Sequence, residues 1–474
     1  MPDSKNVEIL KNGIRKYAPV VAEYFDCNDT ITEFSHTLYA YTADSVHTQR
    51  QELLARTIAG YLARVFQRQE RLTPPLSLNI VDHHSILNHP ILLATNLVAN
   101  AHRLLTGDRQ PIVVLTSSVV PPNNFFNRKG FQLHGKRVPL FSNKEMHQAS
   151  CFIGRRDFNF TENLRKTDSW NNFTGEEQDF LKAIEQEIGG LDFSRVQSYN
   201  DQIGVINAFL WKKLFHKSIR ETIPDLLYVT QEDIMRTILP SVLAEDNILS
   251  RSLFKSDFRT RILAAFEDLT GCWNEAKGKG THFFWYRDAK NEAKPMFLRG
   301  TILRSTDGRF ELDLGNSAEV IKSLADGAII PNLFVIFGYL TFWLGVRPLV
   351  GHGSCNYLTK MKEAWLSVLA DEPDESARVQ SVDTKGLIGG TIATYARDAQ
   401  NAIINQYAFD VIYDGGLTRD YLEHLLAMKY KDLLQPALLE IYESYVPAAE
   451  RKNLGLRPMD MMGEEFNWIG THGK

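Results

Sequence analysis

A strand, a helix and a second strand follow one another within residues 76–115, and this pattern limits the fold more than any other feature of the chain. Residues 76–81 form a short β-prone run, and residues 111–115 form a second one. Pro90 suits the first turn of a helix that we expect to extend to about Leu105, and Gly107 suits its end. Two strands joined through a helix are parallel. The sequence therefore predicts an α/β fold with a parallel sheet.

The segments on either side of this unit are predominantly helical. Residues 50–66 place apolar side chains at steps of three and four, which predicts an amphipathic helix. The acidic Asp-Glu-Pro-Asp-Glu stretch at 371–375 is typical of a linker. We expect a helical N-terminal segment at 1–75, an α/β core with inserted helices and a hairpin at 76–370, and a helical C-terminal region at 371–474. The hairpin is predicted from strands at 297–303 and 309–314, joined through Asp307-Gly308.

An uncharged stretch at 328–346 allows two interpretations. Its length approaches the roughly 20 apolar residues that a membrane-spanning helix needs. However, Pro331, Asn332 and Gly338 interrupt it, and no second stretch of this kind occurs in the sequence. We therefore expect a buried core segment and no membrane association.

Charge and cysteine content narrow the class of protein further. The 53 Lys and Arg residues nearly balance the 57 Asp and Glu residues, and no long basic run occurs, so nucleic acid is not expected as a partner. The four cysteines form no Cys-x-x-Cys pair. A reduced, cytoplasmic location is the simplest interpretation.

The loop that follows the first strand of the unit concentrates groups capable of chemistry. It holds Asp82, His83, His84, Asn88 and His89 at the carboxyl end of a predicted parallel strand, where open α/β sheets bind ligands. Imidazole transfers protons near neutral pH, and imidazole and carboxylate groups also bind divalent metals. The alternative is that these histidines cap the next helix and contact neighbouring loops without a catalytic role.

The triplet Asp82-His83-His84 is similar to the manganese-binding motif of the Asp-His-His phosphoesterases. Those enzymes carry an aspartate-rich motif on an earlier strand, which residues 1–75 do not provide. They also carry a C-terminal Gly-Gly-Gly-His motif, whereas Gly389-Gly390 is followed here by Thr391.

A second candidate loop is glycine-rich and runs from Val350 to Tyr357. Glycine lets a backbone approach a ligand closely, and the N–H groups of such a turn suit an anion. His352 and Cys355 could act as base and nucleophile, or the glycines could serve only a tight turn. Further hydroxyl groups follow the second strand of the unit, at Thr116, Ser117 and Ser118.

The order of these motifs resembles the cysteine-adding enzymes of bacillithiol biosynthesis, from about residue 20 to about residue 370. In that family a strand ends in Gly-Gln-Gln-x-Gly-Leu before a helix, where residues 79–92 here read Asn-Ile-Val-Asp-His-His-Ser-Ile-Leu-Asn-His-Pro-Ile-Leu. Later in the family's sequence come an antiparallel pair of strands, a long apolar segment and the motif Gly-Pro-Gly-Glu, which is followed by Asn-Tyr. The corresponding residues here are Gly351-His352-Gly353-Ser354-Cys355-Asn356-Tyr357.

The resemblance implies a Rossmann-like core in an enzyme that joins an amino acid to a small polar substrate. Gly351, Gly353, Asn356 and Tyr357 carry over directly, but Asp82-His83-His84 replaces Gly-Gln-Gln and Ser354 replaces the family's Glu. The long C-terminal coiled coil of the family is not evident in 371–474. These departures favour a different substrate or a different chemistry.

Three hypotheses about function follow. The first is a biosynthetic enzyme of the ligase or transferase type that acts on a small polar or anionic substrate. Its cofactor could be a nucleotide or a divalent metal. The second is a metal-dependent hydrolase, phosphoesterase or lyase with Asp82, His83, His84 and His89 as ligands, and the third is a non-catalytic binding protein. A homodimer is also left open. For the first hypothesis the expected catalytic residues are Asp82, His84 and His89, and the expected ligand-binding residues are Asn88, Ser117, Gly351, His352, Gly353, Ser354, Asn356 and Tyr357.

Overall fold

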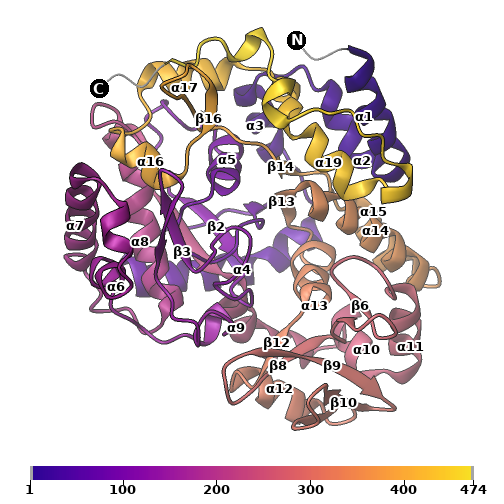
Figure 1. The fold of residues 1–474 in the computed structure, drawn as a ribbon. Helices are drawn as coiled ribbons and strands as arrows, with labels where there is room; N and C mark the ends of the chain where they lie inside the picture. The colour runs from indigo at the N-terminus through magenta and orange to yellow at the C-terminus, as the bar shows by residue number, and fades with distance from the viewer. Residues whose placement is uncertain (1–3, 471–474) are drawn as a thin grey trace.

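A five-stranded parallel sheet forms the centre of the molecule, which confirms the α/β, Rossmann-like class (Figure 1). The computed structural model describes residues 4–470. Strand β1 lies between β13 and β2, β14 pairs with β13, and β5 pairs with β2, all in parallel. The βαβ unit predicted at 76–115 is therefore present. Its strands and their sheet neighbours are β1 (Ser77–Asn79), β2 (Ile112–Thr116), β5 (Leu226–Thr230), β13 (Arg347–Gly351) and β14 (Leu387–Gly389).

Both faces of this sheet are buried against helices. In β2 and β5, Val113 and Leu227 belong to one hydrophobic cluster, and their neighbours Val114 and Tyr228 belong to the other. This alternation follows from the two-residue period of a strand. One cluster includes apolar side chains of α4 and α9, and the other includes those of α5 and α8. The bounds of these four helices are α4 (Ser45–Phe66), α5 (Pro90–Ala99), α8 (Tyr199–Lys213) and α9 (Gln231–Leu243).

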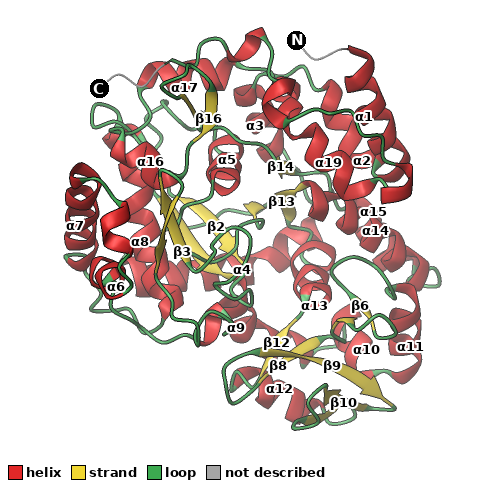
Figure 2. Cartoon of the chain, viewed as in Figure 1, coloured by secondary structure: helices red, strands yellow, loops and turns green. Residues whose placement is uncertain are grey.

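A second sheet, antiparallel and also five-stranded, lies beside the first in the lower part of Figure 2. Its order is β11-β10-β9-β8-β12. The uncharged stretch at 328–346 enters it as β12 and continues into α13 and a π-helical segment at Gly338–Trp343, whose side chains are largely buried. The expectation of a buried core segment is therefore confirmed. The strands are β8 (Phe284–Arg287), β9 (Ala293–Arg299), β10 (Ile302–Ser305), β11 (Glu311–Asp313) and β12 (Ile329–Pro331).

The N-terminal and C-terminal helices pack together at the top of the molecule, where α1 contacts α19 (Figure 1). The predicted helical character of residues 1–75 is confirmed over the described part. The remaining helices are α1 (Ser4–Tyr17), α2 (Pro19–Ala22), α3 (Ile31–Tyr39), α6 (Phe160–Lys166), α7 (Gly175–Gly189), α10 (Ile248–Phe254), α11 (Ser256–Ala265), α12 (Ser317–Ala325), α13 (Leu333–Phe337), α14 (His352–Val368), α15 (Pro373–Ser381), α16 (Ala408–Tyr413), α17 (Arg419–Ala427), α18 (Tyr430–Leu434) and α19 (Leu438–Tyr445). Three further strand pairs are β3 (Gly130–Leu133) with β4 (Lys136–Pro139), β6 (Trp273–Asn274) with β7 (Lys279–Gly280), and β15 (Tyr395–Arg397) with β16 (Ile403–Asn405).

Three boundaries differ from those expected. Helix α5 ends at Ala99 rather than near Leu105, because Asn100 leaves the helical conformation with φ −113° and ψ 13°. The segment 297–303 is not one strand, since Gly300 at φ +64° reverses the chain between β9 and β10. The boundary at residue 370 cuts through the core, because β14 is an edge strand of the parallel sheet. The stretch at 371–375 leads into α15 and is not a linker between separate sheets.

Within residues 4–470, no helix combines the length and the apolar character that crossing a bilayer requires.

Candidate functional site

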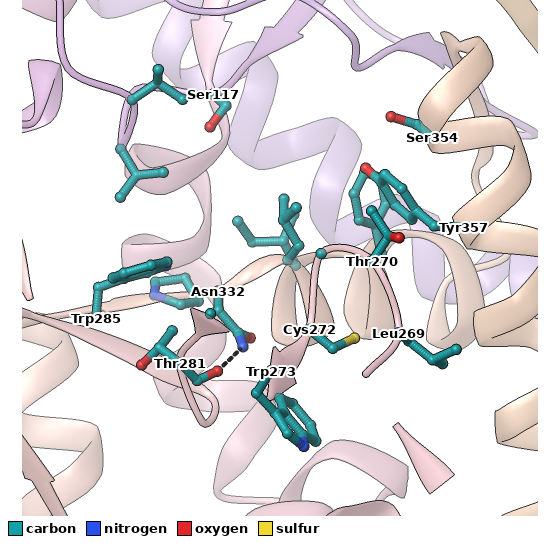
Figure 3. Close-up of a pocket in the computed structure, with 18 of the residues that line it drawn as sticks. Ser117, Leu269, Thr270, Cys272, Trp273, Thr281, Trp285, Asn332, Ser354 and Tyr357 are labelled. Carbon is teal, nitrogen blue, oxygen red and sulfur yellow. Dashed lines mark hydrogen bonds between the residues drawn. The ribbon is translucent and has the colours of Figure 1, made fainter. Parts of the chain in front are cut away.

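A cavity of about 500 Å³ lies between the carboxyl edge of the parallel sheet and the antiparallel sheet. Figure 3 shows its labelled side chains, with Ser117 on one side and Ser354 on the opposite side. Such an edge is the usual ligand site of open α/β sheets. The polar and aromatic side chains that line it include His83, Ser117, Gln231, Thr270, Asn274, Thr281, Trp285, Asn332, Ser354 and Tyr357.

His83 and Ser117 reach the cavity from neighbouring strand ends. The two residues form a parallel bridge beyond β1 and β2, with the N–H of His84 donating to the carbonyl of Ser117 at 2.8 Å. Bridge partners in a parallel pair project to the same face, so both side chains line the cavity. Burial lowers the pKa of His83, and its Nδ1 has no hydrogen-bond partner among residues 4–470. The imidazole is therefore neutral at pH 7 and able to accept a proton.

Glu232 holds the loop after β2 in place. Its carboxylate accepts hydrogen bonds from the N–H and hydroxyl of Ser118, at 2.8 and 2.7 Å. It also accepts from the hydroxyl of Ser117 at 3.2 Å, which aligns that hydroxyl beside the cavity. Burial raises the pKa of Glu232, although the bonds from Ser118 oppose the rise.

The glycine-rich loop ends β13 and begins α14, as expected. Gly351 is the N-cap residue in an extended conformation, and no side chain caps the first turn, so its N–H groups can bind an anion. Ser354 and Tyr357 line the cavity from this helix. A Cβ on Gly351 would lie 3.2 Å from Val81, whereas one on Gly353 would meet no atom within 4 Å. Close packing therefore explains why residue 351 is a glycine, but it does not explain the glycine at 353.

The sequence did not predict the wall formed by residues 268–281. This segment carries the β6–β7 hairpin, and its carbonyl at Thr281 accepts a hydrogen bond from Asn332 Nδ2 at 2.8 Å, drawn in Figure 3. Residues 276–280 have the composition of a flexible turn, and the aromatic run at 283–286 is typical of a strand in the core. Phe283 and Phe284 are buried, but Trp285 lines the cavity. The glycines at 271, 278 and 280 are the sequence feature that could have indicated this wall.

Gln231 was also missed, because it begins a helix whose pattern indicated only packing. Its side chain is 1% exposed and lines the cavity. The amide nitrogen donates to the carbonyl of Leu115 at 3.1 Å, and Oε1 has no partner in the described part of the chain.

None of the three expected catalytic residues, Asp82, His84 and His89, lines this cavity. His84 is 2% exposed, and its Nε2 donates to the carbonyl of Asn200 at 2.9 Å. Its Nδ1 then accepts from the hydroxyl of Thr116 at 2.7 Å. Burial lowers the pKa of His84 to about 4. Because both nitrogens are used in the core, the geometry favours a structural role for this residue.

Asp82 lies in a buried polar cluster beneath the sheet edge. Its carboxylate accepts hydrogen bonds from Thr95 Oγ1 at 2.9 Å, from Asn96 Nδ2 at 2.8 Å and from the hydroxyl of Tyr228. Burial raises the pKa of Asp82 to about 6, and the bonds from Tyr228 and Asn96 limit that rise. This carboxylate anchors the end of β1 to α5 and β5.

We expect the destabilisation caused by Asp82→Asn to be larger at pH 5 than at pH 7, by about 1 kcal/mol. The folded-state pKa near 6 exceeds the unfolded value of 3.8, so the folded protein binds the proton more tightly. The resulting stabilisation is complete below the unfolded pKa and is lost as the pH rises through about 6. Urea denaturation of both proteins at both pH values measures the difference. An equal penalty at pH 5 and pH 7 would show that Asp82 keeps an ordinary pKa.

The other predicted residues are dispersed. His89 caps α5 and lines a separate pocket, and burial together with the charge of Arg128 lowers its pKa to about 4. Asn88 Oδ1 accepts from the N–H of Gln132 at 3.2 Å. Half-buried Asn356 lies on α14 outside the cavity.

His352 and Cys355 do not form an active dyad. The His352 ring packs beneath Gly390 and its Nδ1 lies 3.4 Å from the hydroxyl of Tyr445. Burial raises the pKa of the Cys355 thiol to about 12, which keeps it protonated and unreactive.

The proposed metal ligands Asp82, His83, His84 and His89 do not converge. Among residues 4–470, no group of three or more His, Cys, Asp or Glu side chains is placed to hold a metal ion. Asp82 and His84 use their polar atoms in separate core contacts, while His83 and His89 line different cavities. The structure therefore does not bring these four residues together at one site, and metal binding by this loop stays a prediction.

No family model matches the chain, and no curated protein matches it in sequence.

Proposed function

We propose that the protein is a small-molecule biosynthetic enzyme of the ligase or transferase type, resembling the bacillithiol cysteine-adding enzymes in motif order but using a different substrate. The observation that carries this proposal is the cavity at the carboxyl edge of the parallel sheet, into which both candidate loops send residues. His83 and Ser117 come from the strand ends, and Ser354 comes from the start of α14. Its volume of about 500 Å³ suits a small molecule.

Each group has a role that suits group transfer between small polar molecules. The neutral imidazole of His83 can take the proton from an attacking amine as the new bond forms. The N-terminal N–H groups of α14 can hold a carboxylate, or the oxygen on which negative charge develops. Trp285 and Tyr357 offer apolar surface to the remainder of the substrate. In this proposal His83 replaces His84 and His89 as the acid–base residue.

A product search tests the proposal. The purified protein is incubated with each common amino acid and a panel of small polar amines, with and without ATP and a divalent cation. Mass spectrometry then searches for a product whose mass is the sum of two substrates less one water. We expect such a product, and we expect His83→Ala to form it at least about 100-fold more slowly.

The control is His216→Ala, since His216 is a half-buried histidine that does not line the cavity and whose Nδ1 contacts Ser218. Its activity should equal that of the unaltered protein. Equal activity of His83→Ala would remove His83 from the chemistry. Absence of any condensation product across the panel would contradict the ligase or transferase assignment.

A further inference from the structure

A second pocket of about 240 Å³ lies over the N-terminus of α5. One side is formed by His89 and by Phe125 of the loop after β2, and the other by the C-terminal region, including Tyr407 and Glu440. The phenyl ring of Phe126 lies 5.0 Å from the His83 ring and 5.2 Å from the His89 ring, measured between centroids. Phe126 therefore stands between this pocket and the main cavity, and the two are separate sites.

Aromatic rings dominate the walls of this pocket. The His89 ring lies 5.1 Å from that of Phe125 and 5.4 Å from that of Tyr407. Phe125 is 55% exposed, so its ring is open to a ligand in the pocket. Aromatic faces attract both flat apolar groups and cations.

The pocket is lined by acceptors and donors alike, such as the amide of Asn405 and the hydroxyl of Tyr407. Asn405 Oδ1 is buried and has no hydrogen-bond partner among the described residues. Glu440 also lines the pocket, and within residues 4–470 its carboxylate forms no ion pair. Burial and the charge of Glu443 raise its pKa. An unpaired carboxylate beside aromatic faces favours a ligand that carries positive charge and an apolar group.

Arg128 and His89 restrict where the positive charge of the ligand can lie. The Arg128 guanidinium lies 5.6 Å from the centroid of Phe125, so the positive end of a ligand is disfavoured there. His89 stays neutral because burial and Arg128 lower its pKa to about 4. The charge of the ligand should therefore point toward Glu440, with its apolar part between His89, Phe125 and Tyr407.

We propose that this pocket binds a small organic amine that carries a flat apolar group. The ring of such a ligand stacks on Phe125 and Tyr407, and its ammonium group pairs with the Glu440 carboxylate. The proposal rests on this pocket alone, because it requires neither turnover nor a particular substrate in the main cavity. It can therefore fail while the proposed function stands, and the reverse is also true.

Three probes of similar size but different charge test whether charge or apolar contact determines binding. Phenethylamine, 2-phenylethanol and phenylacetate are titrated into the full-length protein at pH 7, with binding followed by ligand-observed NMR and calorimetry. We expect phenethylamine to bind at least about 5-fold more tightly than the alcohol, and phenylacetate to bind more weakly than either. Glu440→Gln should remove the preference for the amine, and Phe125→Ala should weaken all binding by about 5-fold or more.

Ser354→Ala is the matched control, because Ser354 lines the main cavity and not this pocket. Phenethylamine binding should be unchanged in it. Equal affinity for amine and alcohol, or an affinity that Glu440→Gln leaves unaltered, would overturn the proposal. A loss of binding in Ser354→Ala would overturn it too, since the amine would then occupy the main cavity. So would the absence of binding at about 10 mM, the affinity expected of a ligand this small.

Discussion

Replacing His84 by alanine is expected to lower the free energy of unfolding by about 3 kcal/mol, whereas replacing its neighbour His83 is expected to change it by less than about 1 kcal/mol. The His84 ring fills core space and satisfies the carbonyl of Asn200 and the hydroxyl of Thr116. Its loss leaves a cavity and removes both of these buried hydrogen bonds. His83 lines an open cavity and its Nδ1 has no partner in the described chain, so its removal breaks no hydrogen bond of that atom.

Urea denaturation at pH 7 measures both effects, and His84→Gln provides a control in which a polar side chain remains. We expect His84→Gln to recover part of the loss because its amide can donate to the Asn200 carbonyl. The activity of His83→Ala should be lost in a protein that unfolds at the same urea concentration as the unaltered chain. If the two alanine variants were equally destabilised, the assignment of one histidine to the core and the other to the cavity would be wrong.

The contrast between His83 and His84 also explains why the fold could be predicted better than the site. The βαβ pattern at 76–115 gave the parallel sheet because strand and helix periods are local properties. Residues 82–84 continue past β1, where His83 pairs with Ser117, and alternation alone predicts that His83 and His84 point to opposite sides. Which side faces a cavity depends on the antiparallel sheet, whose position no local pattern contains.

The same limit applies to the residues brought together from a distance. Ser117, Ser354 and Tyr357 were expected near ligand because each follows or begins an element at the carboxyl edge, and all three line the cavity. Gln231 and Trp285 meet them only through tertiary packing, and their own segments indicated a helix and a strand. Conversely, Asp82 looked chemically active because it is a carboxylate beside histidines, but its partners Thr95, Asn96 and Tyr228 make it part of the core. Burial, which a sequence pattern does not reveal, decides between the two roles.

The largest loss of structure at the site is expected from a change at Gly280, in the hairpin that forms one wall of the cavity. A Cβ built at this residue would lie 1.8 Å from the carbonyl oxygen of Cys272 and 2.9 Å from the Cα of Trp273. Backbone atoms cannot yield as a flexible side chain does, so Gly280→Ala must separate β6 from β7, where Trp273 pairs with Gly280. Gly280 also has φ +67°, which adds the strain of a left-handed conformation. We expect a loss of about 3 kcal/mol or more in the free energy of unfolding.

Gly278 provides the matched control two residues away. It has φ +61°, but a Cβ there would meet no atom within 4 Å, so Gly278→Ala carries the conformational strain without the clash and should cost about 1 kcal/mol. Hydrogen exchange followed by mass spectrometry distinguishes local opening from global loss. Peptides covering 268–281 should exchange faster in Gly280→Ala and at nearly the normal rate in Gly278→Ala. Because Asn274, Thr281 and Trp273 line the cavity from this segment, product formation should fall with the faster exchange. Equal exchange in the two variants would show that the wall does not depend on the close approach of Gly280 to Cys272.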